Sequence, residues 1–164
     1  MARKPALQEL QKLVSRCAAA ILYQPLKSEI DYNNRSFPLE IPVNNLVLPN
    51  NKNNDPFEWA ANCIAKFQNI NVYILIPGTR FDRYGTRYGQ GGGWYDRFLS
   101  KVPATWLRIG ITDKSQMSAV KLLKQEWDEP VDWIVVSNNN LWEVHKINAN
   151  QLLRSKEHGK ASLN

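Results

Sequence analysis

The sequence has few cysteines and histidines and no long hydrophobic run. Its two cysteines, Cys17 and Cys63, are too few and too isolated for a disulfide framework or a cysteine-based zinc site. The two histidines, His145 and His158, lie in the polar C-terminal stretch, where we expect surface residues rather than catalysts. No apolar run approaches the roughly 18 residues of a membrane span, and residues 1–12 lack the features of a secretory leader. We therefore expect a cytoplasmic protein.

The chain also lacks an internal repeat, a linker and a block of like charges. Its 164 residues carry 21 Lys and Arg against 15 Asp and Glu, which gives a net charge of +6. This balance indicates an anionic partner, but the disordered basic arm that is typical of nucleic-acid-binding tails is absent. We predict one domain over residues 1–147, followed by a polar tail over residues 148–164.

The pattern of apolar residues predicts an α/β fold with a mainly parallel sheet flanked by helices. Buried strands are expected at residues 72–76, 106–111 and 133–136, with a short strand near residues 21–23. Helices are expected over residues 7–22, leading into that short strand, over 57–68 and 118–125, and from Trp94 onward. The proline-rich stretch of residues 32–56 leaves room only for short extended pieces and turns.

Glycine is scarce except in one segment, since six of the eight glycines fall within residues 78–93. A Gly-rich turn between a buried strand and a helix offers backbone N–H groups to phosphate. The segment is not a Walker loop, because it lacks Gly-Lys followed by Ser or Thr. It is not a dinucleotide fingerprint either, because Trp94 stands where the third glycine is required. A flexible loop or a close crossing of two backbones remains the alternative interpretation.

Acidic residues lie close to this segment in the sequence. Asp96 falls in the first turn of the expected helix, where it would complement the helix dipole or share a Mg²⁺ ion with nucleotide phosphates. A second acidic group follows at residues 126–132, four acids among seven residues. This group could supply a partner carboxylate for the metal or form a solvated acidic turn.

Taken together, these residues resemble the signature of the 5-formyltetrahydrofolate cyclo-ligases, also called methenyltetrahydrofolate synthetases. The matching residues are Pro77-Gly78, Phe81-Asp82, Gly85, Arg87, Gly89-x-Gly91-x-Gly93 and Tyr95-Asp96-Arg97-Phe98-Leu99. The likeness continues through Arg108-Ile-Gly-Ile, Gln116 and Asp128 to Val136. The resemblance implies a single Rossmann-like α/β domain.

The resemblance also implies a set of functional residues. ATP would bind Lys4, Arg87, Gly89, Gln90, Gly91, Gly92, Gly93, Trp94 and Tyr95. Mg²⁺ would be held by Asp96 and Asp128, and the reduced folate would contact Glu29 and Trp94. Arg87 and Tyr95 would take part in catalysis.

The implied reaction consumes ATP and Mg²⁺ and acts on 5-formyltetrahydrofolate. The formyl oxygen attacks the γ-phosphate and releases ADP. The folate N10 then closes onto the activated carbon and expels phosphate, which gives 5,10-methenyltetrahydrofolate. No nucleic-acid or membrane partner is implied, and we expect a monomer or a small homo-oligomer.

This sequence departs from the family pattern at several positions, and these departures keep two alternatives open. Gln8 replaces an arginine of the family's N-terminal helix, the segment between residues 31 and 71 is short, and Trp94 and Trp127 replace a commoner Tyr and His. The first alternative is a paralogue that binds ATP and Mg²⁺ but acts on another substrate. The second, suggested by the basic charge and the six tryptophans, is a nucleotide- or nucleic-acid-binding module without catalysis.

Overall fold

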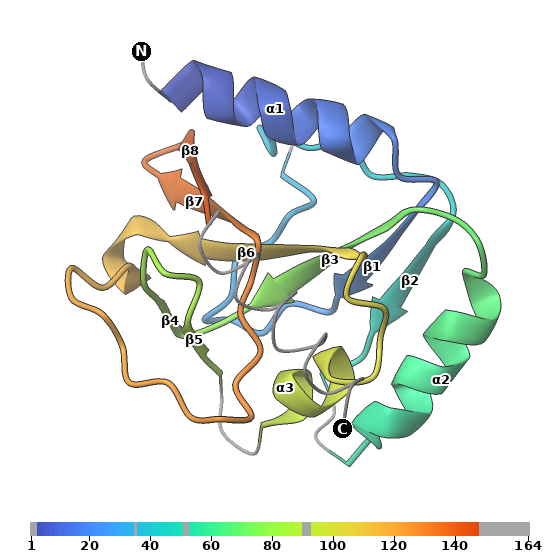
Figure 1. The fold of residues 1–164 in the computed structure, drawn as a ribbon. Helices are drawn as coiled ribbons and strands as arrows, with labels where there is room; N and C mark the ends of the chain where they lie inside the picture. The colour runs from blue at the N-terminus through green and yellow to red at the C-terminus, as the bar shows by residue number, and fades with distance from the viewer. Residues whose placement is uncertain (1–2, 35, 51–52, 90–92, 148–164) are drawn as a thin grey trace.

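The structure is a computed structural model that describes residues 3–34, 36–50, 53–89 and 93–147. One six-stranded sheet runs through it in the order β2-β1-β3-β6-β7-β8 (Figure 1). Its strands are β1 (Ala19–Tyr23), β2 (Asn45–Leu48), β3 (Val72–Pro77), β6 (Leu107–Asp113), β7 (Trp133–Asn138) and β8 (Leu141–Lys146). All neighbouring pairs are parallel except β7 and β8. The expected α/β class with a mainly parallel sheet is therefore confirmed.

Helices cover both faces of the sheet (Figure 1). Helix α1 (Arg3–Ser15) lies on one face, while α2 (Pro56–Lys66) and α3 (Trp94–Leu99) lie on the other. A short 3₁₀ turn, η1 (Lys114–Gln116), follows β6. Strands β4 (Arg80–Phe81) and β5 (Arg87–Tyr88) pair with each other as a two-stranded ribbon and are not hydrogen-bonded into the main sheet. None of the helices within the described ranges has the length and apolar character of a membrane span.

Local sequence explains where several of these elements begin and end. All six residues of β3 are buried, as expected for a strand covered on both faces. Helix α2 begins after Asp55, whose side chain accepts a hydrogen bond from the backbone N–H of Phe57 at 2.9 Å, with Pro56 at the first helical position. The first helix ends at Ser15 rather than running on to residue 22, because the chain enters β1 at Ala19.

The helix predicted over residues 118–125 is wrong, because this segment forms neither a helix nor a strand. Two of its backbone N–H groups donate to the neighbouring ribbon. Ser118 donates to the carbonyl of Phe81 at 2.7 Å, and Leu122 donates to the buried Asp82 carboxylate at 2.8 Å. Tertiary partners have therefore overridden the helical spacing of the apolar residues.

The strand predicted over residues 133–136 is longer than expected, and it is followed by another strand. A tight turn at Asn139 and Asn140, with φ values of 50° and 66°, reverses the chain into β8. Asparagine tolerates this left-handed conformation better than other residues with side chains do. The asparagine run at residues 138–140 was thus the signal for a hairpin.

A buried phenylalanine joins the ribbon to the sheet. The ring of Phe81 is fully buried and lies against two glycines, Gly78 after β3 and Gly110 within β6. A Cβ atom at Gly110 would lie 2.5 Å from this ring, and one at Gly78 would lie 2.8 Å from it. The ribbon can therefore approach the sheet only because both positions lack a side chain.

Replacing Gly110 with alanine should force the Phe81 ring out of this position. We expect Gly110→Ala to lower the free energy of unfolding by about 1–3 kcal/mol, the usual cost of overpacking a filled core. Urea denaturation measures the change. The Phe81→Leu background, which makes room for the methyl group, should reduce the cost of Gly110→Ala, and equal costs in both backgrounds would contradict this explanation.

Candidate functional site

A cavity of about 340 Å³ opens beyond the carboxyl ends of the central strands. Tyr23 and Gln24 line it at the end of β1, Leu48 and Pro49 at the end of β2, and Pro77 at the end of β3. From β1 the chain adds β2 on one side of that strand and then crosses to add β3 on its other side. The switch point therefore lies between β1 and β3, and ligands of open α/β sheets bind at such points. The fold therefore places the cavity where ligands are expected.

The positive charge of Arg87 lies within the wall of this cavity. Its side chain is only 6% exposed, and its Nε donates a hydrogen bond to the carbonyl of Pro77 at 2.9 Å. The guanidinium lies over the ring of Tyr95, with its carbon 5.1 Å from the ring centroid, and Nη1 lies 4.0 Å from the Asp96 carboxylate. These contacts hold a buried cation in one orientation, which suits the binding of an anion.

The aromatic residues at the start of α3 are also fixed. Trp94 stacks on Phe98, with centroids 5.4 Å apart and planes 15° apart, and its indole N–H donates to the carbonyl of Asn54 at 2.8 Å. Tyr95 meets Trp94 edge to face at 5.2 Å, and burial raises the pKa of its hydroxyl. Both rings line the cavity, so they form a rigid aromatic wall.

Two glycines of the Gly-rich segment lie in the described part of the cavity wall. Gly93 precedes α3 with φ 64° and ψ 28°, a left-handed conformation that a residue without Cβ adopts at little cost. Gly89 lies so close to Arg87 that a Cβ atom there would be 2.6 Å from Nη2. Gly89 thus leaves room for the guanidinium.

A pair of carboxylates, Asp96 and Asp128, faces the cavity from two different segments. Asp96 accepts a hydrogen bond from the backbone N–H of Glu129 at 3.0 Å, and Asp128 accepts one from Gln125 at 2.8 Å. Burial raises the pKa of Asp96, the Glu129 N–H and Arg87 lower it, and the adjoining Asp128 carboxylate raises it again. The net shift is upward, so the two negative charges are under-compensated without a cation.

This donor set fits magnesium better than zinc. Structural zinc sites take four protein ligands, mostly Cys and His, whereas this pair offers two carboxylates. Mg²⁺ commonly keeps several waters and binds through one or two carboxylates together with substrate phosphates. Asp96 and Asp128 would supply those carboxylates, and the raised pKa of Asp96 is what a cation would reverse.

Glu29 lies on another wall of the cavity, in the loop after β1. Its carboxylate accepts a hydrogen bond from the backbone N–H of Leu26 at 2.9 Å, and the Leu26 carbonyl in turn accepts one from Glu29 at 2.9 Å. Burial raises the pKa of Glu29, while the Leu26 N–H and Arg87 lower it. Tyr23, whose hydroxyl donates to the Ile30 carbonyl at 2.6 Å, holds the same loop against β1.

The structure brings most of the predicted site residues to this one cavity. Those that line it are Glu29, Arg87, Gly89, Gly93, Trp94, Tyr95, Asp96 and Asp128. Gln90, Gly91 and Gly92 lie outside the described residues, as does the side chain of Lys4. Gln8 is exposed on α1. The roles of all these residues remain predictions.

Sequence reasoning missed several residues that line the cavity. They are Tyr23, Gln24, Leu26, Leu48, Pro49, Asn50 and Tyr88. Most of them follow the ends of β1 and β2, so their common signal is a position just beyond a parallel strand. Trp127, noted only as a departure from the family pattern, also lines the cavity and is 66% exposed.

Comparisons with known proteins point to one family. A family model described as the 5-formyltetrahydrofolate cyclo-ligase family matches residues 43–137. The 5-formyltetrahydrofolate cyclo-ligase of Escherichia coli K12 is 28% identical over 141 residues, which are 85% of this chain and 72% of that one. A mitochondrial 5-formyltetrahydrofolate cyclo-ligase of Arabidopsis thaliana is 56% identical over 32 residues, 20% of this chain and 11% of that one.

A solved structure shares the fold. The NMR structure of 5,10-methenyltetrahydrofolate synthetase from Aquifex aeolicus matches with a TM-score of 0.50 at 20% identity. The match covers 88% of this chain and 90% of that one. At this level of identity the likeness concerns the fold alone.

The proximity of Asp96 and Asp128 leads to a prediction about the pKa of Asp96. Replacing Asp128 with Asn removes a like charge, so the pKa of Asp96 should fall in the metal-free protein. A raised carboxyl pKa keeps a proton on the native state after the unfolded chain has lost it. The free energy of unfolding therefore falls as pH rises from the Asp96 pKa of the unfolded chain to that of the native protein. Asp128→Asn should bring these two pKa values closer together.

Carbon-13 NMR titration of the Asp96 carboxyl measures this shift. Glu126→Gln, which neutralises an exposed acid in the same segment, serves as the control. A fall in the Asp96 pKa that is equally large in the control would show a general charge effect instead of a local pair.

Proposed function

The chain belongs to the 5-formyltetrahydrofolate cyclo-ligase family, a family of ligases, and we propose that it is itself such an enzyme. In this proposal it uses ATP and Mg²⁺ to convert 5-formyltetrahydrofolate to 5,10-methenyltetrahydrofolate, and it releases ADP and phosphate. The observation that carries the proposal is one cavity at the switch point of the sheet that gathers a buried guanidinium, Arg87, and a carboxylate pair, Asp96 and Asp128.

The polyphosphate of ATP would lie against Arg87 and the Gly-rich segment. A guanidinium held by the Pro77 carbonyl and the Tyr95 ring keeps its remaining N–H groups in a fixed direction. Fixed donors stabilise charge that develops during phosphoryl transfer without reorganising at the moment of reaction. In this proposal Lys4 and the backbone of Gln90, Gly91 and Gly92 add further contacts to ATP.

The folate would occupy the side of the cavity that contains Glu29 and Trp94. Glu29 is held by the Leu26 backbone, so its carboxylate can accept hydrogen bonds from a pterin ring at a fixed position. Trp94 uses its indole N–H on Asn54 and therefore offers the ligand an apolar face. Tyr95 lies between this side and Arg87, where it would line the reacting groups.

The chemistry requires positioning and charge neutralisation more than proton transfer. The formyl oxygen must approach the γ-phosphate in line with the departing ADP oxygen. In this proposal the groups that position the two ligands come from separate elements around the cavity: Glu29 from the loop after β1, Arg87 from β5, and Trp94 from α3. Asp96 and Asp128 would hold Mg²⁺, and the ion would supply positive charge that offsets the negative charge of the polyphosphate.

Direct assay tests the proposal. Mixing the protein with ATP, Mg²⁺ and 5-formyltetrahydrofolate should produce the near-ultraviolet absorbance of the methenyl product. Protein that binds ATP but yields no product at high enzyme concentration would contradict the proposal. That result would favour a paralogue that acts on another substrate.

Loss of one metal carboxylate should nearly abolish turnover. We expect Asp96→Asn to reduce kcat on the order of 10²–10³-fold, because charge on the transferring phosphate is no longer neutralised. Glu58→Gln, a charge change on the exposed face of α2, should leave kcat unchanged. Unaltered kcat in Asp96→Asn would remove Asp96 from the metal site.

A methyl group at Gly89 should act through Arg87. In Gly89→Ala the new Cβ would lie 2.6 Å from Nη2 of Arg87 unless the guanidinium moved, so we expect ATP to bind about tenfold or more weakly. Calorimetric titration with a non-hydrolysable ATP analogue measures this affinity. In an Arg87→Met background Gly89→Ala should weaken binding of the analogue only slightly. An equally large further loss of affinity in that background would show that Gly89 acts independently of Arg87.

A further inference from the structure

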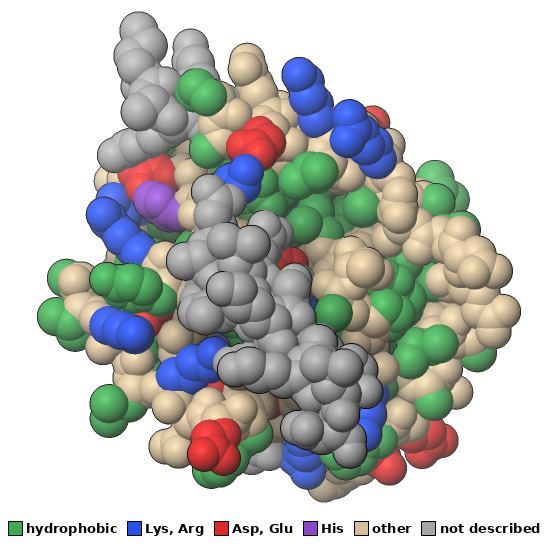
Figure 2. Space-filling model, viewed as in Figure 1, with side chains coloured by type: hydrophobic (Ala, Val, Ile, Leu, Met, Phe, Trp, Pro, Cys, Tyr) green, Lys and Arg blue, Asp and Glu red, His purple; other side chains and the backbone are tan. Residues whose placement is uncertain are grey.

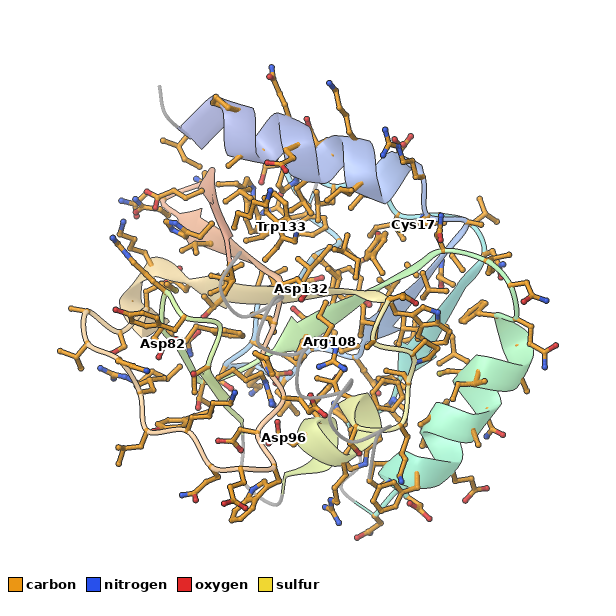
Figure 3. The ribbon with its side chains drawn as sticks, in the orientation of Figure 1. Cys17, Asp82, Asp96, Arg108, Asp132 and Trp133 are labelled. Atoms are coloured by element: carbon orange, nitrogen blue, oxygen red, sulfur yellow. The ribbon has the colours of Figure 1, made fainter. Side chains whose placement is uncertain are left out.

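A second buried arginine, Arg108, lies behind the carboxylate pair and has no part in the proposed chemistry. It lies in β6, and its side chain is fully buried. In Figure 3 Arg108 lies between Asp132 and helix α3, the helix that carries Asp96. A buried guanidinium is costly unless its hydrogen bonds are well placed, so its partners indicate its role.

The guanidinium of Arg108 joins two segments that are far apart in the sequence. Nη2 donates to the carbonyl of Leu99, the last residue of α3, at 2.9 Å. Nη1 donates to the Glu129 carboxylate at 3.0 Å and lies 3.4 Å from the Pro130 carbonyl. One rigid planar group therefore spans from the end of α3 to the segment before β7.

Each of these two segments carries one of the paired carboxylates. Asp96 lies in α3, three residues before Leu99, and Asp128 directly precedes Glu129. The segments also meet at the site itself, because the backbone N–H of Glu129 donates to the Asp96 carboxylate at 3.0 Å. A change in the position of Glu129 would therefore move the Asp128 backbone relative to Asp96.

The backbone of Arg108 is fixed as firmly as its side chain. Its N–H donates to the buried Asp132 carboxylate at 3.0 Å, and its carbonyl accepts from the Asp132 N–H at 2.8 Å. These two bonds fix the segment that leads into β7 beside β6. The guanidinium thus extends from a backbone position that cannot shift without disturbing the sheet.

We propose that Arg108 is a positioning residue that sets the separation of Asp96 and Asp128 for a divalent cation, by clamping Leu99 and Glu129 together. This inference rests on the proposed function, because that function places Mg²⁺ between the two carboxylates. Mg²⁺ tolerates little departure from octahedral geometry. Groups that orient its ligands typically change metal affinity by about 10–100-fold when they are replaced.

Substitution at Arg108 tests this role through metal affinity. Lysine keeps the charge but cannot reach Leu99 and Glu129 together, so Arg108→Lys should raise the Mg²⁺ concentration for half-maximal turnover about tenfold or more. The kcat at saturating Mg²⁺ should change much less. Electron paramagnetic resonance of Mn²⁺, titrated into protein saturated with a non-hydrolysable ATP analogue, should show the same loss of affinity without turnover.

Variants at Glu129 keep the proposal testable if Arg108→Lys does not fold. Glu129→Gln retains an oxygen that accepts from Nη1, whereas Glu129→Ala removes it, so Ala should weaken Mn²⁺ binding more than Gln does. Glu143→Gln is the matched control: Glu143, like Glu129, is bonded to a cation, Lys114 at 3.2 Å, but it is buried in β8 and does not line the cavity.

The outcomes separate this inference from the proposed function. Unchanged Mn²⁺ affinity in both Arg108→Lys and Glu129→Ala, with normal metal binding by the wild-type protein, would overturn the positioning role alone. An equal loss in Glu143→Gln would overturn it too, because the effect would then be general destabilisation. Failure of the wild-type protein to bind Mn²⁺ beside the ATP analogue would overturn the proposed metal site, and the inference with it.

Discussion

The site depends on a positive charge held out of water. Arg87 is almost completely buried, and a buried guanidinium without partners would be strongly destabilising. It has three partners, the Pro77 carbonyl at the end of β3 and, on α3, the Tyr95 ring and the Asp96 carboxylate. The requirement to satisfy this one cation thus fixes the end of the central strand against the start of the following helix. The same requirement explains Gly89, because a side chain there would occupy the space of the guanidinium.

Helix α3 is held at both ends by arginines that differ in accessibility. Arg87 lies near its first turn and faces the cavity, whereas Arg108 bonds its last carbonyl from beneath and is shielded from solvent. The helix has only six residues, too few to be stable from its own hydrogen bonds. Its position therefore comes from these contacts and from the packing of Phe98 and Leu99 into the core. A short helix held in this way can present Asp96 with little freedom, which suits a ligand that requires fixed geometry.

The structure also shows where the positive charges of the molecule lie. The net charge of +6 indicated an anionic partner without identifying it. In the part of Figure 2 that is not drawn in grey, Lys and Arg side chains lie in separate groups among acidic and apolar side chains. The cation that matters most for the proposed function is Arg87, which contributes little to the surface.

The sequence by itself determined the elements whose signals are local. The apolar run of β3 and the Asp55-Pro56 start of α2 act on their immediate neighbours, and the motif over residues 77–99 identified the family. Only the tertiary structure decided the rest. Residues 118–125 do not form a helix, because Phe81 and Asp82 accept hydrogen bonds from the backbone N–H groups of Ser118 and Leu122. The cavity gathered Tyr23, Glu29, Arg87 and Asp128 because the order of parallel strands, which no local pattern contains, brings distant strand ends together.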